Sequence, residues 1–133
     1  MAFYRTREGA ITAADSFTAL DSLYGQSTTA SVQVPSGASS IVGIVASIAT
    51  DSATNGAATF AMQLSGDGLS SGQETLTIGS QGVDGTPASN GMTNSPMTLD
   101  VAIPVVGSNQ VSIAVAMDVD VGSAQAAVTL VFA

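Results

Sequence analysis

The strongest constraint on the fold is the alternation in VSIAVAMDVDV, residues 111–121. Successive side chains of a β-strand point to opposite faces, so this segment has one apolar face and one face of small or polar residues. The apolar face contains Val111, Ile113, Val115, Met117, Val119 and Val121. The second face contains Ser112, Ala114, Ala116, Asp118 and Asp120. Alanine adds little hydration, so we expect the second face to pack against another sheet of this chain or another subunit.

Similar short runs occur along the chain, separated by turn sequences rich in Gly, Pro, Asn and Ser. We expect strands at residues 28–34, 39–50, 57–66, 74–80, 97–106, 111–121 and 126–133. Segment 39–50 is apolar on both faces, so it is either covered on both sides or part of a subunit contact. Pro104 indicates that its strand lies at an edge or bends there.

Seven to eight short strands with little helix predict an all-β fold, an antiparallel β-sandwich of jelly-roll type. Residues 81–96 read as one long loop, and residues 11–25 as a strand or loose turn, although a helical spacing is also present. A length of 133 residues suggests one domain. We therefore expect an N-terminal arm at residues 1–10 and a single β-sandwich domain at residues 11–133.

The charge pattern excludes several classes of partner. The chain has ten acidic residues, two arginines and no lysine, and its net charge is −8. Phosphate backbones and anionic membrane surfaces attract proteins with several cations, so we expect no nucleic acid partner and no membrane insertion. The excess of acidic residues resembles, in a weaker form, the composition of proteins from high-salt environments. The alternative is a small acidic protein from a mesophile. The N-terminus carries no secretory signal pattern.

The residues needed for common catalysis are missing. The chain contains no histidine, cysteine or lysine, which removes the usual general base, thiol nucleophile and Schiff-base amine. The segment GLSSG at 68–72 matches a nucleophile elbow, but no histidine is present to take the serine proton. The glycines of 65–72 lack the lysine and helix of a phosphate-binding loop. We expect no enzyme activity, no catalytic residues and no cofactor.

Two acids at one strand end are the remaining ligand candidates. Asp118 and Asp120 share a face and suggest either a divalent cation site shared between subunits or a solvated pair of acids. No glutamate follows at the spacing of a calcium loop, so we assign no metal-binding residue. Sugar binding is weakly supported because the chain has no tryptophan and only Tyr4 and Tyr24 as tyrosines.

Both cationic side chains, Arg5 and Arg7, lie in the expected arm beside Phe3 and Tyr4. Ten extended residues span about 33 Å. We expect this arm to leave its own sandwich and dock on the acidic surface of a neighbour, the alternative being a solvated tail. On this hypothesis, deleting residues 1–10 leaves the fold intact and weakens assembly.

Two runs carry a family resemblance: VQVPSGASSIVGIVASIATDSATNGAATFAMQLSGDGLSSGQETLTIGSQG and LDVAIPVVGSNQVSIAVAMDVDVGSAQAAVTLVFA. Together they resemble small single jelly-roll capsid or capsid-decoration proteins of prokaryotic viruses, those of haloarchaea among them. The resemblance covers residues 28–133 and lies in strand order, small surface residues, the long central loop and a final strand at the C-terminus. It implies a fold without catalytic residues.

The resemblance implies a structural subunit of a virion that binds copies of itself, as a trimer or larger ring, and neighbouring capsid proteins. Two alternatives stay open. One is a ligand-binding module of carbohydrate-binding or lectin-like type, which would need stacking aromatics or a calcium site. The other is a subunit of an extracellular filament or surface layer.

Overall fold

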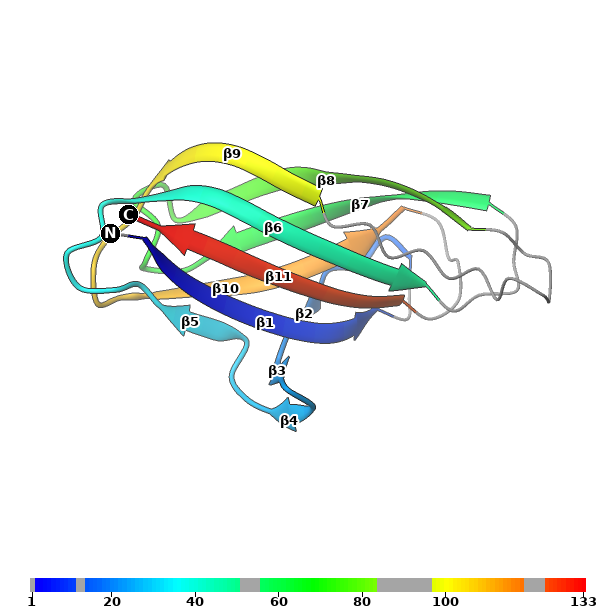
Figure 1. Cartoon of the computed structure of the whole chain (residues 1–133), viewed down its shortest axis with the longest axis horizontal. Helices are drawn as coiled ribbons and strands as arrows, with labels where there is room; N and C mark the ends of the chain where they lie inside the picture. Colours follow the sequence, from blue (N-terminus) through cyan, green and yellow to red (C-terminus); the bar gives the residue numbers. More distant parts are fainter. Residues whose placement is uncertain (1, 12–13, 51–55, 84–96, 119–123) are drawn as a thin grey trace.

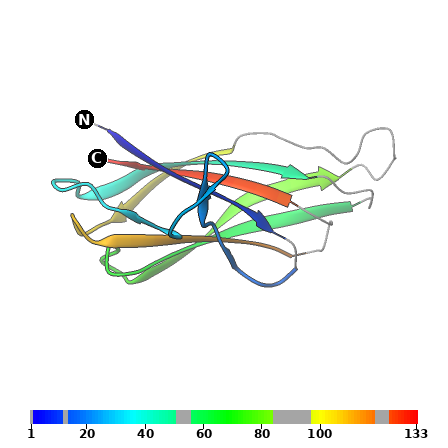
Figure 2. The ribbon, with the colours of Figure 1, turned by 90° about the horizontal axis from the view of Figure 1, so that it is seen from below.

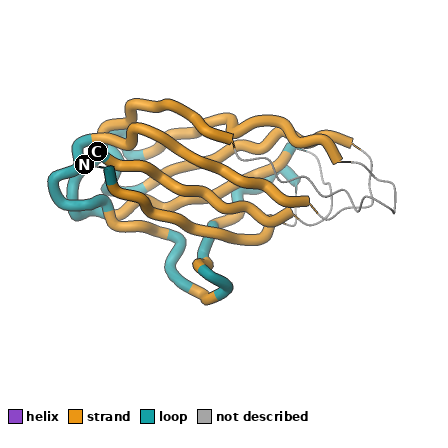
Figure 3. Tube along the Cα trace, viewed as in Figure 1, coloured by secondary structure: helices purple, strands orange, loops and turns teal. Residues whose placement is uncertain are grey.

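A computed structural model describes residues 2–11, 14–50, 56–83, 97–118 and 124–133. The described residues form two antiparallel sheets and no helix (Figures 1 and 3). Sheet A contains, in spatial order, β4 (Gln26–Ser27), β3 (Ser22–Leu23), β1 (Phe3–Ile11), β11 (Ala124–Phe132), β6 (Ser40–Thr50) and β9 (Met97–Pro104). Sheet B contains β2 (Thr18–Ala19), β10 (Gln110–Met117), β7 (Gly56–Ser65) and β8 (Gln73–Val83), and β5 (Ser31–Gln33) also pairs with β10.

The strand pairing is that of a jelly roll. The first strand, β1, pairs with the last, β11; β2 and β5 pair with β10; β6 pairs with β9; and β7 pairs with β8. Such nested antiparallel pairs, wound over two facing sheets, define the jelly-roll sandwich. Counting β2 and β5 as one interrupted strand and leaving out β3 and β4 gives eight strands. The predicted fold class is confirmed.

The interruption between β2 and β5 is a small hairpin. β3 and β4 pair through a two-residue turn in which Tyr24 and Gly25 have φ values of 53° and 76°. Positive φ at both central positions matches the twist of antiparallel strands and is the usual geometry of such tight hairpins. β3 joins β1 through the pair Glu8 and Ser22, so this excursion crosses to the edge of sheet A. In Figure 1 the hairpin projects from the body. The described part of residues 11–25 is therefore extended and not helical.

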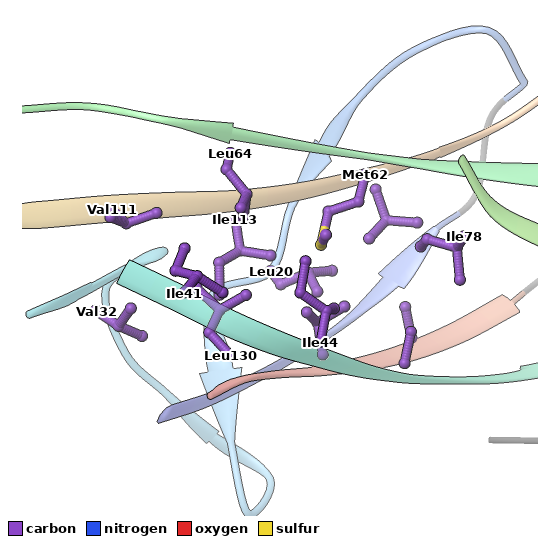
Figure 4. Close-up of a cluster of buried hydrophobic side chains, with 14 of the residues drawn as sticks. Leu20, Val32, Ile41, Ile44, Met62, Leu64, Ile78, Val111, Ile113 and Leu130 are labelled. Carbon is purple, nitrogen blue, oxygen red and sulfur yellow. The ribbon is translucent and has the colours of Figure 1, made fainter. Parts of the chain in front are cut away.

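The core fills the space between the two sheets, which Figure 2 shows as two layers. Its side chains are almost all aliphatic, as the scarcity of aromatic residues predicts, and only Phe60 and Phe132 add buried rings. Figure 4 shows part of this cluster, with Ile113 and Leu64 from sheet B facing Ile41 and Leu130 from sheet A. Fully burying one such side chain stabilises the fold by about 1.5–3 kcal/mol.

The expected N-terminal arm is wrong for residues 3–10. These residues belong to β1, which runs in register with β11 from Phe3 opposite Phe132 to Ile11 opposite Ala124. β1 protects one edge of β11, and its last residue, Ile11, is fully buried. The arm therefore is not free to reach a neighbour, because its backbone already completes sheet A.

The two arginines of this segment also have intramolecular partners. The Arg7 guanidinium donates to the Thr29 carbonyl at 2.8 Å, to the Ser31 carbonyl at 3.0 Å and to the Thr6 carbonyl at 2.8 Å. Arg7 thereby connects β1 of sheet A to the segment that enters β5 of sheet B. Arg5 donates to the Tyr4 carbonyl at 3.1 Å. The correction therefore has two physical reasons: the backbone of β1 pairs with β11, and the Arg7 guanidinium binds carbonyl groups of its own chain.

Candidate functional site

The second face of the opening segment lies on the outer surface of sheet B. Val111, Ile113 and Val115 of β10 are fully buried, so the alternate residues of the strand point outward. Residues paired directly across an antiparallel ladder point to the same side, which extends this surface onto the neighbouring strands. We call it the neutral face: Ala19, Ser31, Gln33, Ala61, Gln63, Ser65, Thr75, Thr77, Gln110, Ser112, Ala114 and Ala116.

The neutral face carries no ionisable side chain, although the chain has a net charge of −8. The central strands of both sheets, β10 and β7 in sheet B and β11 and β6 in sheet A, contain no ionisable residue at all. The charged residues that the structure describes lie on edge or flanking strands, on loops or at strand ends. A second protein can therefore cover the centre of this face without burying an unpaired charge.

The outer face of sheet A is similar but has acids at its margins. Its central strands expose Val45, Ser47, Ala127, Thr129 and Val131 in part. Glu8 and Asp100 flank them, on β1 and β9. No described segment forms a second layer over β6, whose residue Val42 is 39% exposed. The sequence left two interpretations of segment 39–50, a strand covered on both faces or a strand at a subunit contact. The described residues of this chain do not cover its outer face.

A pocket of about 320 Å³ lies at one end of the neutral face. Its lining residues are Asp15, Phe17, Thr59, Ala61, Ala116, Met117 and Asp118. Phe17 directly precedes β2, and the residue is 40% exposed. We call this cavity the Phe17 pocket. It combines an aromatic wall and alanine methyl groups with two carboxylates.

A second, polar pocket of about 370 Å³ lies on sheet B near the turns that join its strands. Its lining residues are Ser31, Gly66, Asp67, Ser108, Asn109, Gln110 and Ser112. Asn109 Nδ2 donates to the Asp67 carbonyl oxygen at 3.2 Å, which connects the β7–β8 loop to the β9–β10 turn. Hydroxyl and amide groups of this kind can bind sugar hydroxyls, but no aromatic ring lines the pocket for stacking.

The GLSSG segment lies between β7 and β8 and is held there by backbone hydrogen bonds. Gly68 N donates to the Gln110 carbonyl at 2.8 Å, and Val106 N donates to the Gly68 carbonyl at 2.8 Å. Ser70 N donates to the Pro104 carbonyl at 3.1 Å. The segment does not follow the strand–turn–helix geometry of a nucleophile elbow, although Ser71 Oγ donates to Glu74 Oε1 at 2.8 Å. It connects the two sheets at this end of the sandwich.

The structure brings one of the two predicted acids into a pocket. Asp118 directly follows β10, and its Oδ1 accepts a hydrogen bond from Thr59 N at 2.7 Å. Asp120 lies outside the described residues. Within the described ranges, no group of three or more potential metal ligands is present. Sequence reasoning missed Asp15 and Phe17 as neighbours of Asp118, because Asp15 N donates to the Met117 carbonyl about a hundred residues away in the chain.

Comparisons with known proteins support the fold. The chain is similar to part of dimeric latent PorU from Porphyromonas gingivalis, with 14% identity, 98% coverage of this chain, 12% coverage of that chain and a TM-score of 0.56. It is also similar to the capsid of Helicobacter pylori bacteriophage KHP30, with 15% identity, coverage of 100% and 94%, and a TM-score of 0.43. A third similar structure is the VP2 subviral particle of infectious bursal disease virus, with 14% identity, 99% coverage of this chain, 32% coverage of that chain and a TM-score of 0.48.

At these identities the similarities establish the fold alone, and the two viral matches, with TM-scores below 0.5, carry no further argument. The chain spans only 12% of the PorU chain, whose activity therefore does not transfer. No protein-family model matches the sequence, and neither does any curated protein. A helix long and apolar enough to cross a membrane is absent from the described residues.

Proposed function

We propose that this protein is a non-enzymatic structural subunit of a viral capsid, as a shell or decoration protein, which assembles with copies of itself and with neighbouring capsid proteins. The observation that carries the proposal is the neutral face, an outer sheet surface without charge on a chain of net charge −8. A stable interface needs about 800 Å² from each partner. An uncharged sheet face of serine, threonine, alanine and glutamine offers close packing at low desolvation cost.

The jelly-roll fold is compatible with this proposal but does not by itself indicate a function. The absence of histidine, cysteine and lysine from the sequence supports a non-enzymatic role. We infer a homo-oligomer, a trimer or larger ring, located in the virion. No cofactor is required for such a role.

Three glutamine-to-glutamate substitutions test the proposal, because they add the same charge at almost constant size. Gln63 lies on the central strand β7 within the neutral face. We expect Gln63→Glu to weaken assembly at least tenfold, because the new carboxylate would be buried without a partner. Gln26→Glu, on the β3–β4 hairpin, is the matched control and should assemble as the wild type does. Light scattering and negative-stain microscopy measure particle size.

A third variant, Gln125→Glu on β11, tests the outer face of sheet A. If Gln125→Glu assembles normally and Gln63→Glu does not assemble, the neutral face is supported as the contact between subunits. The reverse result moves the contact to sheet A and contradicts our assignment. A wild-type protein that stays monomeric at tens of micromolar, in both dilute and molar salt, contradicts self-assembly itself.

A ligand-binding module is the second candidate, because the polar pocket has the size of a small-molecule site. Titration with a panel of neutral mono- and disaccharides tests it. Chemical-shift changes confined to Ser108–Gln110 would favour this candidate over the capsid proposal.

A further inference from the structure

The Phe17 pocket differs from the rest of the neutral face because it joins apolar contact area to negative charge. Its apolar surface comes from the Phe17 ring and from the methyl groups of Ala61 and Ala116. Its charges come from Asp15 and Asp118. The cavity, about 320 Å³, opens to solvent and has room for one long side chain.

Backbone hydrogen bonds hold both acids in position around the pocket. Thr59 N donates to Asp118 Oδ1 at 2.7 Å, and Asp118 N donates to the Thr59 carbonyl at 3.1 Å. Asp15 N donates to the Met117 carbonyl at 2.8 Å. The Asp118 carboxylate is thus fixed against β7, and the backbone of Asp15 is fixed to the end of β10, which reduces the ordering needed when a ligand arrives.

A guanidinium group on an aliphatic stem matches this combination. Its methylene groups can lie against the Phe17 ring and Ala116, while its charged end reaches the carboxylates. A cation over an aromatic face is attracted to the ring, and a guanidinium–carboxylate pair forms strong, directional hydrogen bonds. A neutral or anionic ligand would bring no positive charge to the two acids.

We propose that the Phe17 pocket receives an arginine side chain from a different polypeptide, a basic neighbour of this subunit. The inference rests on the proposed function, since it names the chemistry of the neighbouring capsid protein. The occupant does not come from a second copy of this chain. The chain has two arginines, and both Arg5 and Arg7 already donate to carbonyls of their own chain. A subunit of net charge −8 is complementary to a basic partner.

The first experiment is an NMR titration of the full-length, ¹⁵N-labelled protein with N-acetyl-Gly-Arg-Gly-amide at low salt. The control peptide carries citrulline in place of arginine, which keeps the shape and removes the charge. We expect shift changes centred on residues 15–18, 59–61 and 116–118 with the arginine peptide, and none with the citrulline peptide. Equal shifts with both peptides, or changes scattered over the whole surface, would overturn the proposal.

Two pairs of variants separate the pocket from general charge attraction. Phe17→Ala leaves the net charge unchanged and should weaken binding of the arginine peptide about two- to fivefold. Its control is Tyr4→Ala, which removes another exposed ring, on the outer face of sheet A. Asp118→Asn removes the charge but keeps an oxygen that can accept the hydrogen bond from Thr59 N. Its control is Asp100→Asn on β9, which changes the net charge by the same amount.

We expect Asp118→Asn to weaken peptide binding about two- to fivefold, and more than Asp100→Asn does. If Phe17→Ala binds the peptide as the wild type does, the pocket does not recognise the side chain and the proposal is wrong. These measurements follow a peptide and not particle size. A protein that binds the peptide in the pocket but never assembles would contradict the proposed function alone.

Discussion

At the scale of single residues, Gly68 shows why the GLSSG segment has its composition. A Cβ atom at this position would lie 2.7 Å from the Gln110 carbonyl oxygen and 2.7 Å from Val111 Cγ2. Both are closer than real Cβ contacts, and the carbonyl oxygen is backbone and cannot move aside. The glycine thus permits the loop to approach β10, where Gly68 N donates to the Gln110 carbonyl, and to accept a hydrogen bond from Val106 N between β9 and β10.

We therefore expect Gly68→Ala to lower the free energy of unfolding by about 1–3 kcal/mol through overpacking. Gly43→Ala is the control, because a Cβ there meets Val131 at an ordinary 3.7 Å. That variant should be neutral, or more stable by up to about 1 kcal/mol, since alanine costs less conformational entropy than glycine. Urea denaturation followed by circular dichroism measures both. If the two variants are equally stable, the loop can shift away from β10 without a cost in stability, which contradicts this prediction.

At the scale of elements, β1 is the clearest example of a strand that local pattern does not reveal. Its inward positions include Arg5 and Arg7 near the open edge of the sandwich, where the Arg7 guanidinium binds carbonyls of the segment leading to β5. On the outward side, Thr6 Oγ1 and Thr129 Oγ1 lie 2.8 Å apart, within hydrogen-bond distance across the β1–β11 ladder. β1 is held by its partners more than by its own hydrophobicity.

Deletion of residues 1–10 should consequently remove the cooperative thermal unfolding transition, because β11 loses its ladder partner and the core loses its cover at one edge. A domain of this size has only about 5–15 kcal/mol of net stability to lose. Deletion of residues 1–2, which precede β1, is the control and should leave the transition within a few degrees of the wild type. If the longer deletion melts like the wild type, β1 is dispensable and the arm hypothesis returns.

At the scale of the whole molecule, charge and neutrality are separated in space. The four central strands carry no ionisable group, and the described acids lie around them; Asp67 on the β7–β8 loop and Asp118 directly after β10 lie at the two ends of the neutral face. Copies that meet through neutral faces bring these acidic margins close to one another. Repulsion between margins therefore opposes an association that the faces themselves favour.

Assembly should accordingly strengthen with salt. The Debye length falls from about 10 Å at 0.1 M to about 3 Å at 1 M, so repulsion between margins is largely screened at the higher concentration. Analytical ultracentrifugation over this range of NaCl concentrations should show a rising mean mass. Sodium sulfate at matched ionic strength separates screening from the salting-out of apolar surface. A mass that stays constant or falls with NaCl contradicts this account.

Local pattern in the sequence was sufficient to predict the class of fold. Strand periodicity is a property of neighbouring residues, so segment 39–50 could be predicted as a strand and matches β6, Ser40–Thr50. In the same way, Pro104 indicated an edge or a bend, and β9 is an edge strand of sheet A. The second face of β10 could also be recognised as unusual from its alanines alone, before its position on sheet B was known.

Only the tertiary structure decided which distant residues meet. The pairing of Phe3 with Phe132 joins the two ends of the described chain, and its register follows from the closed pattern of strand pairs and not from either segment alone. The Phe17 pocket likewise needs the bridge between Ala14 and Met117 to place Asp15 beside Asp118. Long-range contacts of this kind are set by the packing of the two sheets as a whole, because side-chain periodicity specifies a face but not a partner.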